Sequence, residues 1–161
     1  MFERFTRKAR ADVLRAHDVA QRLGAEQVEP EHLLLALAEG HGEAATRALA
    51  EAGLDAPAIE TAIEQDLVAA LAVVGVPASV VASTPIHPRA DRPGLSVAVK
   101  QALEQTMREA ISRGDRRLGS AHLLLGLLSP PAVSVHRVLT RLDVAPARLA
   151  DLVQVEMASR R

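Results

Sequence analysis

Residues 32–37 read His-Leu-Leu-Leu-Ala-Leu and residues 122–127 read His-Leu-Leu-Leu-Gly-Leu, so two nearly identical blocks lie 90 residues apart. Sliding the sequence by that offset aligns residues 5–67 with residues 95–157 without a gap. Nine of the 63 aligned positions are identical, and five of them fall within the block itself. Apolar character is retained at many other aligned positions on both sides of it. The sequence therefore indicates a duplicated unit.

Each unit is expected to contain four helices, which makes the fold all-α. Gly24 and Gly114 are expected to end helices, because glycine readily adopts the left-handed conformation found there. Pro30 suits the first turn of a helix, and Ser120 is a natural N-cap. No segment alternates apolar and polar residues between turns, so no sheet is expected. The eight expected helices cover about residues 4–23, 30–40, 43–52, 55 to beyond 71, 96–113, 120–128, 131–142 and 146–158.

Residues 75–94 are expected to form an extended, non-helical linker between the two units. Four of the nine prolines lie in this stretch, and a glycine stands at each end of it. Proline lacks the amide hydrogen that a helix interior needs. Each unit alone would be small, so we expect residues 1–161 to pack as one domain, with repeat one at 1–74 and repeat two at 95–158.

The composition excludes several classes of site. The chain has 161 residues, no Cys, no Trp, no Tyr and two Phe. Without Cys there is no disulfide scaffold, thiolate metal centre or cysteine nucleophile. The scarcity of aromatic rings argues against a base-stacking surface for nucleic acids. No apolar run approaches the roughly 18 residues of a membrane span, and the first residues contain no signal-peptide core, so a cytoplasmic protein without a membrane partner is expected.

Charge is balanced overall but unevenly distributed. The formal net charge is -1, whereas residues 1–22 carry +3, residues 23–67 carry -9 and residues 68–161 carry +5. These runs are read either as ordinary solvated helix faces or as a basic patch beside an acidic patch suited to a charged peptide. Three basic residues cluster in a way that would suit a DNA-reading helix, a minor alternative, and they are Arg113, Arg116 and Arg117.

No catalytic or metal-binding pattern is found. The glycines are never spaced as Gly-x-x-x-x-Gly-Lys-Ser/Thr, so the chain lacks the loop that surrounds nucleotide phosphates, and it is expected not to be an enzyme. Glu29 and His32 have the i, i+3 spacing of di-iron ligands, but Gly119 replaces the glutamate in repeat two. A buried, hydrogen-bonded histidine at the start of each second helix is the preferred interpretation, with no metal and no cofactor.

Two four-helix repeats, each with a His-Leu-Leu-Leu-x-Leu helix, resemble the N-terminal domain of Clp/Hsp100 unfoldases. The opening Met-Phe-Glu-Arg-Phe-Thr of residues 1–6 resembles the ClpC branch, especially its actinobacterial members. Residues 31–37 match that family's Thr-Glu-His-hydrophobic-Leu-Leu-Gly-Leu signature, apart from the leading Thr, which is Pro30 here, and the Gly, which is Ala36. The resemblance covers about residues 1–157. It implies a docking module that receives substrates and adaptor proteins for a ring-shaped ATPase.

The resemblance leaves the cellular role open. Because its repeats have drifted from the family pattern and its linker is longer than expected for the family, a stand-alone adaptor or decoy without ATPase modules is expected. The alternatives are a regulatory or structural protein that binds the Clp ATPase itself, and the N-terminal fragment of a full-length ClpC-type unfoldase.

The resemblance also implies a phosphoarginine site in each repeat, formed by a Thr at the start of the first helix and the Glu before the His. In repeat one these positions are Thr6 and Glu31, with Arg10 one turn after Thr6. A helix N-terminus suits a phosphate, and a carboxylate suits a guanidinium. The alternative is structural, with Thr6 capping its helix and Glu31 complementing a helix dipole.

The equivalent site in repeat two is expected to be weak or absent. Ser96 and Lys100 take the places of the threonine and the arginine, and both could still hold a phosphate. Ala121 takes the place of the glutamate and offers nothing to a guanidinium. We therefore expect the Glu31→Ala substitution to remove most of the affinity for a phosphoarginine peptide.

Finally, the resemblance implies a surface for cyclic peptide antibiotics along the first helices of both repeats. The family's aromatic residue just before the fifth helix is missing, since residues 84–95 contain no Phe or Tyr, and this argues against antibiotic binding. Phe2 has the alternative role of a core staple. The surface would comprise Phe2, Arg10, Val13, Leu14 and Lys100.

Overall fold

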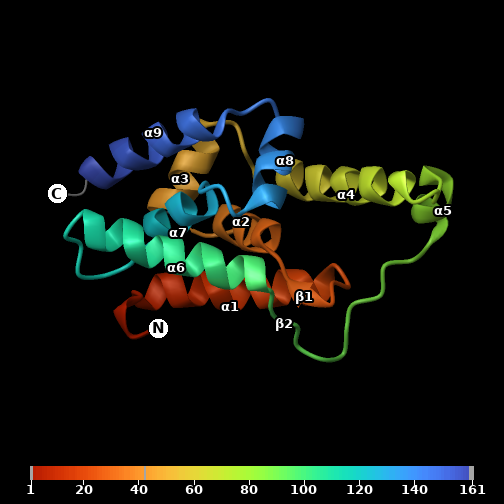
Figure 1. Ribbon diagram of the computed structural model, residues 1–161, viewed down its shortest axis with the longest axis horizontal. Helices are drawn as coiled ribbons and strands as arrows, with labels where there is room; N and C mark the ends of the chain where they lie inside the picture. Colours follow the sequence, from red (N-terminus) through yellow and green to blue (C-terminus); the bar gives the residue numbers. More distant parts are fainter. Residues whose placement is uncertain (1, 42, 160–161) are drawn as a thin grey trace.

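A computed structural model describes residues 2–41 and 43–159 (Figure 1). It confirms an all-α fold of two four-helix repeats. Within the described residues a short 3-10 turn covers Phe2–Arg4. The repeat helices are α1 (Arg7–Arg22), α2 (Pro30–Ala38), α3 (Ala44–Glu51), α4 (Ala56–Val73), α6 (Val97–Ser112), α7 (Ser120–Leu127), α8 (Val133–Arg141) and α9 (Pro146–Ala158).

The helix ends follow the 90-residue repeat closely. Gly24 and Gly114 have φ values of 70° and 71°, which confirms that glycines in the left-handed conformation end α1 and α6. Gly53 has a φ of 77°, and its counterpart Asp143 adopts the same conformation with a φ of 55°. Asp tolerates this region better than most side chains, so the turn survives without glycine.

Two predicted details at helix starts are wrong. The first helix begins at Arg7 rather than near residue 4, because the side chain of Thr6 caps it by accepting a hydrogen bond from the amide of Ala9 at 3.1 Å. Ser120 is the first residue of α7 rather than its N-cap, which is Gly119. The Ser120 hydroxyl instead accepts a hydrogen bond from the amide of Ala45 in α3, at 3.4 Å.

The expectation of no sheet is also wrong, on a very small scale. Strand β1 (Gln27–Val28) pairs in parallel with β2 (Gly94–Leu95), and an isolated parallel bridge joins Phe5 to Leu118. These two pairings are equivalents under the 90-residue offset. Each joins the segment before the first helix of one repeat to the segment before the second helix of the other. A period-2 pattern cannot reveal strands of two residues.

The predicted linker contains a helix. Residues 78–83 form α5 (Ala78–Ser83), so the expectation of an extended segment is wrong for those six residues. Pro77 precedes the helix, where its missing amide hydrogen costs nothing, and Pro85 follows it. After α5 the chain returns to β2 and lies along α1, where the amide of Arg89 donates to the carbonyl of Gln21 at 3.1 Å. In Figure 1, α4 projects from the rest of the domain and carries α5 at its far end.

The core lies where the two repeats meet around α2 and α7, both apolar on nearly every face. The leucines of the two blocks are at most 8% exposed, as expected for central helices. Helices α3 and α9 of different repeats pack together, and so do α4 and α8. No helix among the described residues has the length and apolar character that crossing a bilayer requires.

Helices α6 and α7 approach unusually closely at Gly126. A methyl group added there would collide with Oγ1 of Thr106 and would lie 2.7 Å from the carbonyl oxygen of Ala102. The corresponding positions in repeat one are Ala36 and Ala16, both fully buried. One repeat thus uses Ala against Ala, and the other uses Gly against Thr, to fill the same interhelical space.

We predict that Gly126→Ala lowers the free energy of unfolding by about 2–3 kcal/mol, because an overpacked contact forces the helices apart. Adding Thr106→Ala should restore part of this loss by making the pair resemble Ala16 and Ala36. Urea denaturation of the single and double variants measures both effects. Equal stability of Gly126→Ala and the parent chain would contradict the close contact, and so would a double variant with no recovery.

Candidate functional site

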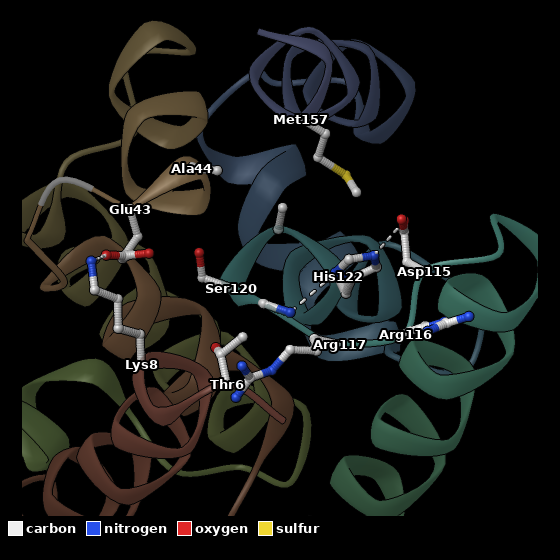
Figure 2. A pocket seen from close by; sticks show the side chains of 12 residues that line it. Thr6, Lys8, Glu43, Ala44, Asp115, Arg116, Arg117, Ser120, His122 and Met157 are labelled. Atoms are coloured by element: carbon white, nitrogen blue, oxygen red, sulfur yellow. Dashed lines mark hydrogen bonds and ion pairs between the residues drawn. The ribbon is translucent and has the colours of Figure 1, made fainter. Parts of the chain in front are cut away.

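A cleft of about 630 Å³ opens where the N-termini of α1, α3 and α7 converge (Figure 2). The bridge between Phe5 and Leu118 builds it, because the Thr6 amide donates to the Leu118 carbonyl oxygen at 2.9 Å and so fixes the start of α1 beside the start of α7. The residues that line the cleft are Thr6, Lys8, Glu43, Ala44, Asp115, Arg116, Arg117, Gly119, Ser120, Ala121, His122 and Met157. We call this the N-terminal cleft.

The N-terminal cleft combines positive and negative groups. Three helix N-termini contribute partial positive charge. In Figure 2 the guanidinium of Arg117 is directed toward Thr6, whereas Arg116 points away from it. Lys8 is paired with Glu43 on one side of the cleft. Such a mixture fits a ligand that carries an anionic group next to a cationic one.

Arg117 also lines a second, shallower hollow of about 440 Å³ next to the N-terminal cleft. This hollow contains Arg10 and Leu14, which the sequence predicted as site residues, together with Arg7. The Arg10 Nε donates to the carbonyl oxygen of Phe5 at 3.2 Å, whereas Arg117 makes no hydrogen bond or ion pair with the described part of the chain. Its guanidinium is therefore available to an anion.

A histidine fixes the start of each central helix. The Nδ1 atoms of His32 and His122 accept hydrogen bonds from the amides of Glu29 and Gly119, at 2.9 Å and 3.1 Å. Because an amide nitrogen can only donate, each Nδ1 is unprotonated. The Nε2 of His122 lies 3.1 Å from Oδ2 of Asp115, which it can donate to. The expectation of buried, hydrogen-bonded histidines is confirmed, and no cluster of three potential metal ligands occurs among the described residues.

Glu31 lies in a different cleft from Thr6. This acidic cleft has a volume of about 380 Å³, and its polar lining residues are Glu29, Glu31, His32, Glu64, Asp66 and Arg137, beside several apolar residues. Oε2 of Glu31 is buried and accepts no hydrogen bond from the described residues. Asp66 is already paired, since its oxygens accept from Arg137 at 2.9 Å and from Arg141 at 3.3 Å.

The predicted grouping of site residues within one repeat is therefore not what the structure shows. Thr6 shares its cleft with Ala121 of repeat two and not with Glu31 of its own repeat. Ser96 likewise follows a strand that pairs with repeat one, and its amide donates to the carbonyl oxygen of Val28 at 3.1 Å. The Ser96 hydroxyl is buried and accepts from the amide of Val99, while Lys100 is exposed and lines neither cleft.

The residues predicted to bind a cyclic peptide likewise do not all lie on one accessible surface. Val13 is only 5% exposed and belongs to the core, so it offers no surface to a ligand. Phe2 packs against Phe5 with ring centroids 5.3 Å apart, yet more than a third of it stays exposed. Leu14 is half exposed beside Arg10. Phe2, Arg10 and Leu14 therefore remain accessible, and Val13 does not.

Sequence reasoning missed Lys8, Glu43, Asp115 and Ser120 as lining residues, and it considered Arg116 and Arg117 only as a DNA-binding cluster. They come from three segments that are brought together by the exchanged pairing between the repeats. The alignment of the repeats identifies equivalent residues, but it does not show whether the residues that contact them belong to the same repeat or to the other one. The bridge between Phe5 and Leu118 shows that the start of α1 lies beside the start of α7 in the other repeat.

Comparison with known proteins identifies the family. A family model described as the Clp repeat N-terminal domain matches residues 4–92 and again residues 94–160. The chloroplast chaperone ClpC1 of Arabidopsis thaliana is 35% identical over 151 residues, covering 92% of this chain and 14% of the relative. Rice chloroplast ClpC1 is 36% identical over 148 residues, covering 91% of this chain and 14% of the relative. The chain thus spans about one seventh of these relatives.

Solved structures share the fold. The N-terminal domain of ClpD from Arabidopsis thaliana superposes with a TM-score of 0.67 at 22% identity, covering 98% of this chain and 99% of that one. A ClpV N-domain in complex with a VipB peptide superposes with a TM-score of 0.57 at 13% identity, covering 94% of this chain and 88% of that one. At these identities the likeness concerns the fold alone.

His32 generates a prediction about pH. Burial lowers the pKa of His32 from 6.5 to about 4, because desolvation disfavours the charged ring. Neutral His32 is the form that the fold prefers, so its contribution is complete above pH 6.5 and is lost as the pH falls toward 4. Asp12 changes the stability with pH in the opposite direction, because burial raises its pKa from 3.8 to about 6. The stabilisation from its protonated form is complete below pH 3.8 and is lost as the pH rises through 6.

We therefore compare Asp12→Asn with the double variant Asp12→Asn/His32→Gln, in which glutamine keeps an acceptor for the amide of Glu29 but cannot titrate. Between pH 6.5 and pH 4 the first variant should lose about 3 kcal/mol of unfolding free energy that the second retains. Urea titrations at several pH values measure the difference. A difference that does not change with pH would show that His32 is not held neutral by the fold.

Proposed function

The chain belongs to the Clp repeat N-terminal domain family, and we propose that it is a non-enzymatic module that binds proteins or peptides of the Clp protease system. The observation that carries this proposal is the N-terminal cleft, a mixed-charge opening built by both repeats. The peptide complex of the ClpV N-domain shows that a domain with this fold can receive a peptide. In this proposal the chain works without a cofactor and supplies binding alone.

The proposed ligand of the N-terminal cleft is an arginine-phosphorylated peptide. Its phosphate would lie against the N-termini of α1 and α7, where backbone amides and Arg117 provide positive charge. Its guanidinium nitrogens would donate to Glu43 or Asp115. One of these carboxylates would take the role of the family's glutamate, because Ala121 occupies that position here. This arrangement differs from the one expected from the sequence, since all of its groups come from the junction between repeats.

Glu31 retains a role in the proposal as an acceptor for a second basic side chain. Its buried Oε2, which accepts no hydrogen bond from the described residues, would gain a charge-assisted hydrogen bond from an arginine or lysine of the peptide. The acidic cleft that holds it has apolar walls at Ile63 and Leu67, which would cover the aliphatic stem of such a side chain. Ser96 and Lys100 have no assigned role, because neither lines this cleft.

In the cell we propose a cytoplasmic, stand-alone role, either as an adaptor that delivers clients to a ClpC-type ATPase or as a decoy that withholds a ligand from it.

The hollow at Arg10 and Leu14, with the accessible ring of Phe2 nearby in sequence, is the surface on which a cyclic peptide would bind. A pull-down experiment distinguishes the adaptor or decoy from a regulator that binds the ATPase itself. Capture of many proteins that free phosphoarginine competes away supports the client receptor, and capture of the ATPase alone, insensitive to the competitor, supports the regulator.

We predict that the chain binds a phosphoarginine peptide in isothermal calorimetry and that Arg117→Ala weakens the affinity at least about tenfold, the loss of one charge-assisted hydrogen bond. Lys100→Ala is the matched control, because Lys100 is an exposed cation outside both clefts, and it should leave the affinity unchanged. The unphosphorylated peptide should bind more weakly.

The Glu31→Ala variant separates the two arrangements. If the phosphoarginine itself occupies the N-terminal cleft, Glu31→Ala reduces the affinity only for peptides with a second basic residue. Loss of all binding in Glu31→Ala, with Arg117→Ala unaffected, would place the phosphoarginine in the acidic cleft and contradict the arrangement proposed. Absence of binding at millimolar peptide would contradict the phosphoarginine proposal as a whole.

A further inference from the structure

The segment from Leu67 to Ile86 is unusual in both sequence and exposure. These twenty residues contain no Asp, Glu, Lys, Arg or His. None of them is fully buried, although they include the last two turns of α4, all of α5 and the turn between them. We call this segment the arm. Five of the eleven large hydrophobic residues that are exposed in the described chain belong to the arm, and they are Leu67, Val73, Val74, Val80 and Ile86.

The arm has both a hollow and a projection. Helix α5 folds back against the end of α4, and the space between them is a groove of about 630 Å³, lined almost entirely by apolar side chains such as Leu71, Val76 and Val81. Val73 and Val74 do not line the groove, and they are 86% and 74% exposed at the end of α4. The same short segment thus offers an apolar groove and two apolar side chains that could fill one.

We propose that the arm is a dimerisation surface whose partner is a second copy of this chain. A contact across a two-fold axis uses the same patch on both subunits, so that patch must be complementary to itself. The arm meets this condition, because the valines at the end of one α4 can enter the groove of the other copy while the reverse occurs at the same time. A contiguous exposed apolar surface of this kind is rare on a protein that stays monomeric.

Charge also favours a second copy over a charged peptide. Two identical surfaces repel each other wherever they carry net charge, and the arm carries none. Within the groove a basic or acidic peptide would find no ion-pairing partner apart from Glu64 at its edge, although Leu67, Ala70 and Ile86 of the arm also border the acidic cleft. The twenty residues of the arm reach the lower end of the 20–30 per side that a standard interface uses, so the segment is long enough to form a specific contact.

The geometry of the dimer has a consequence for ligand binding. In Figure 1 the arm leaves the domain on the side opposite the start of α1 and the end of α9, and the start of α7, which helps to form the N-terminal cleft, lies toward those helix ends. Two copies joined by their arms therefore keep both N-terminal clefts open at the outer ends. The dimer would bind a client with two tags more tightly than a single domain could.

Sedimentation velocity of the whole chain tests the dimer. From about 1 to 500 µM we expect a monomer–dimer equilibrium with a micromolar dissociation constant. Val74→Glu places a charge in the contact and should raise that constant at least about tenfold. Val155→Glu is the matched control, because Val155 is 65% exposed on a helix outside the arm, and it should dimerise like the parent chain. Circular dichroism establishes that both variants remain folded.

Cross-linking gives an independent measurement, because the chain contains no cysteine. A mixture of Val74→Cys and Val81→Cys should form a covalent heterodimer under mild oxidation, because Val81 lines the groove that the end of the partner's α4 enters, and a mixture of Val155→Cys and Val81→Cys should remain monomeric. A parent chain that is monomeric throughout the concentration range overturns the proposal, and so does equal weakening by Val74→Glu and Val155→Glu. A monomer that binds an apolar peptide or a neutral lipid vesicle through Val74 would assign the arm to a client or a membrane instead.

Discussion

The structure depends on the exchanged pairing between its two repeats. The amide of Thr6 donates to the carbonyl oxygen of Leu118, and the amide of Ser96 donates to that of Val28. Each bond is modest by itself, contributing about 1 kcal/mol. Together they set the start of each long first helix beside the start of the central helix of the other repeat. The core around the two leucine blocks and the N-terminal cleft both follow from this arrangement.

Much of the fold could be predicted from the sequence because its signals are local. The histidine and leucines of each block mark a central helix, and Gly24 and Gly114 mark the ends of the first helices. The helix α5 could not be predicted, because prolines at both of its ends suggest an extended chain even though none lies inside it. The strand pairing could not be predicted either, since two residues are too few to form a pattern.

The candidate site was harder to predict than the fold. Thr6 and Arg10 were predicted because their residue types occupy family positions at the start of the first helix; Thr6 lines the N-terminal cleft, and Arg10 lines the neighbouring hollow. Arg117 and Glu43 were not predicted to line the cleft, because their proximity depends on contacts between segments far apart in sequence. Val13 was misplaced because a helix position alone does not distinguish a buried face from an exposed one until the neighbouring helices are known.

The exchanged pairing also bears on how such a domain could arise. The two backbone pairings that join the repeats are counterparts under the 90-residue offset, so two separate copies of one repeat could make the same pairings as a two-fold dimer. The peptide link between the repeats then serves mainly to raise their local concentration. A connection with only that task tolerates insertions, since lengthening a flexible loop costs little entropy. This freedom gives the chain a place where new surface can be added without disturbing the core.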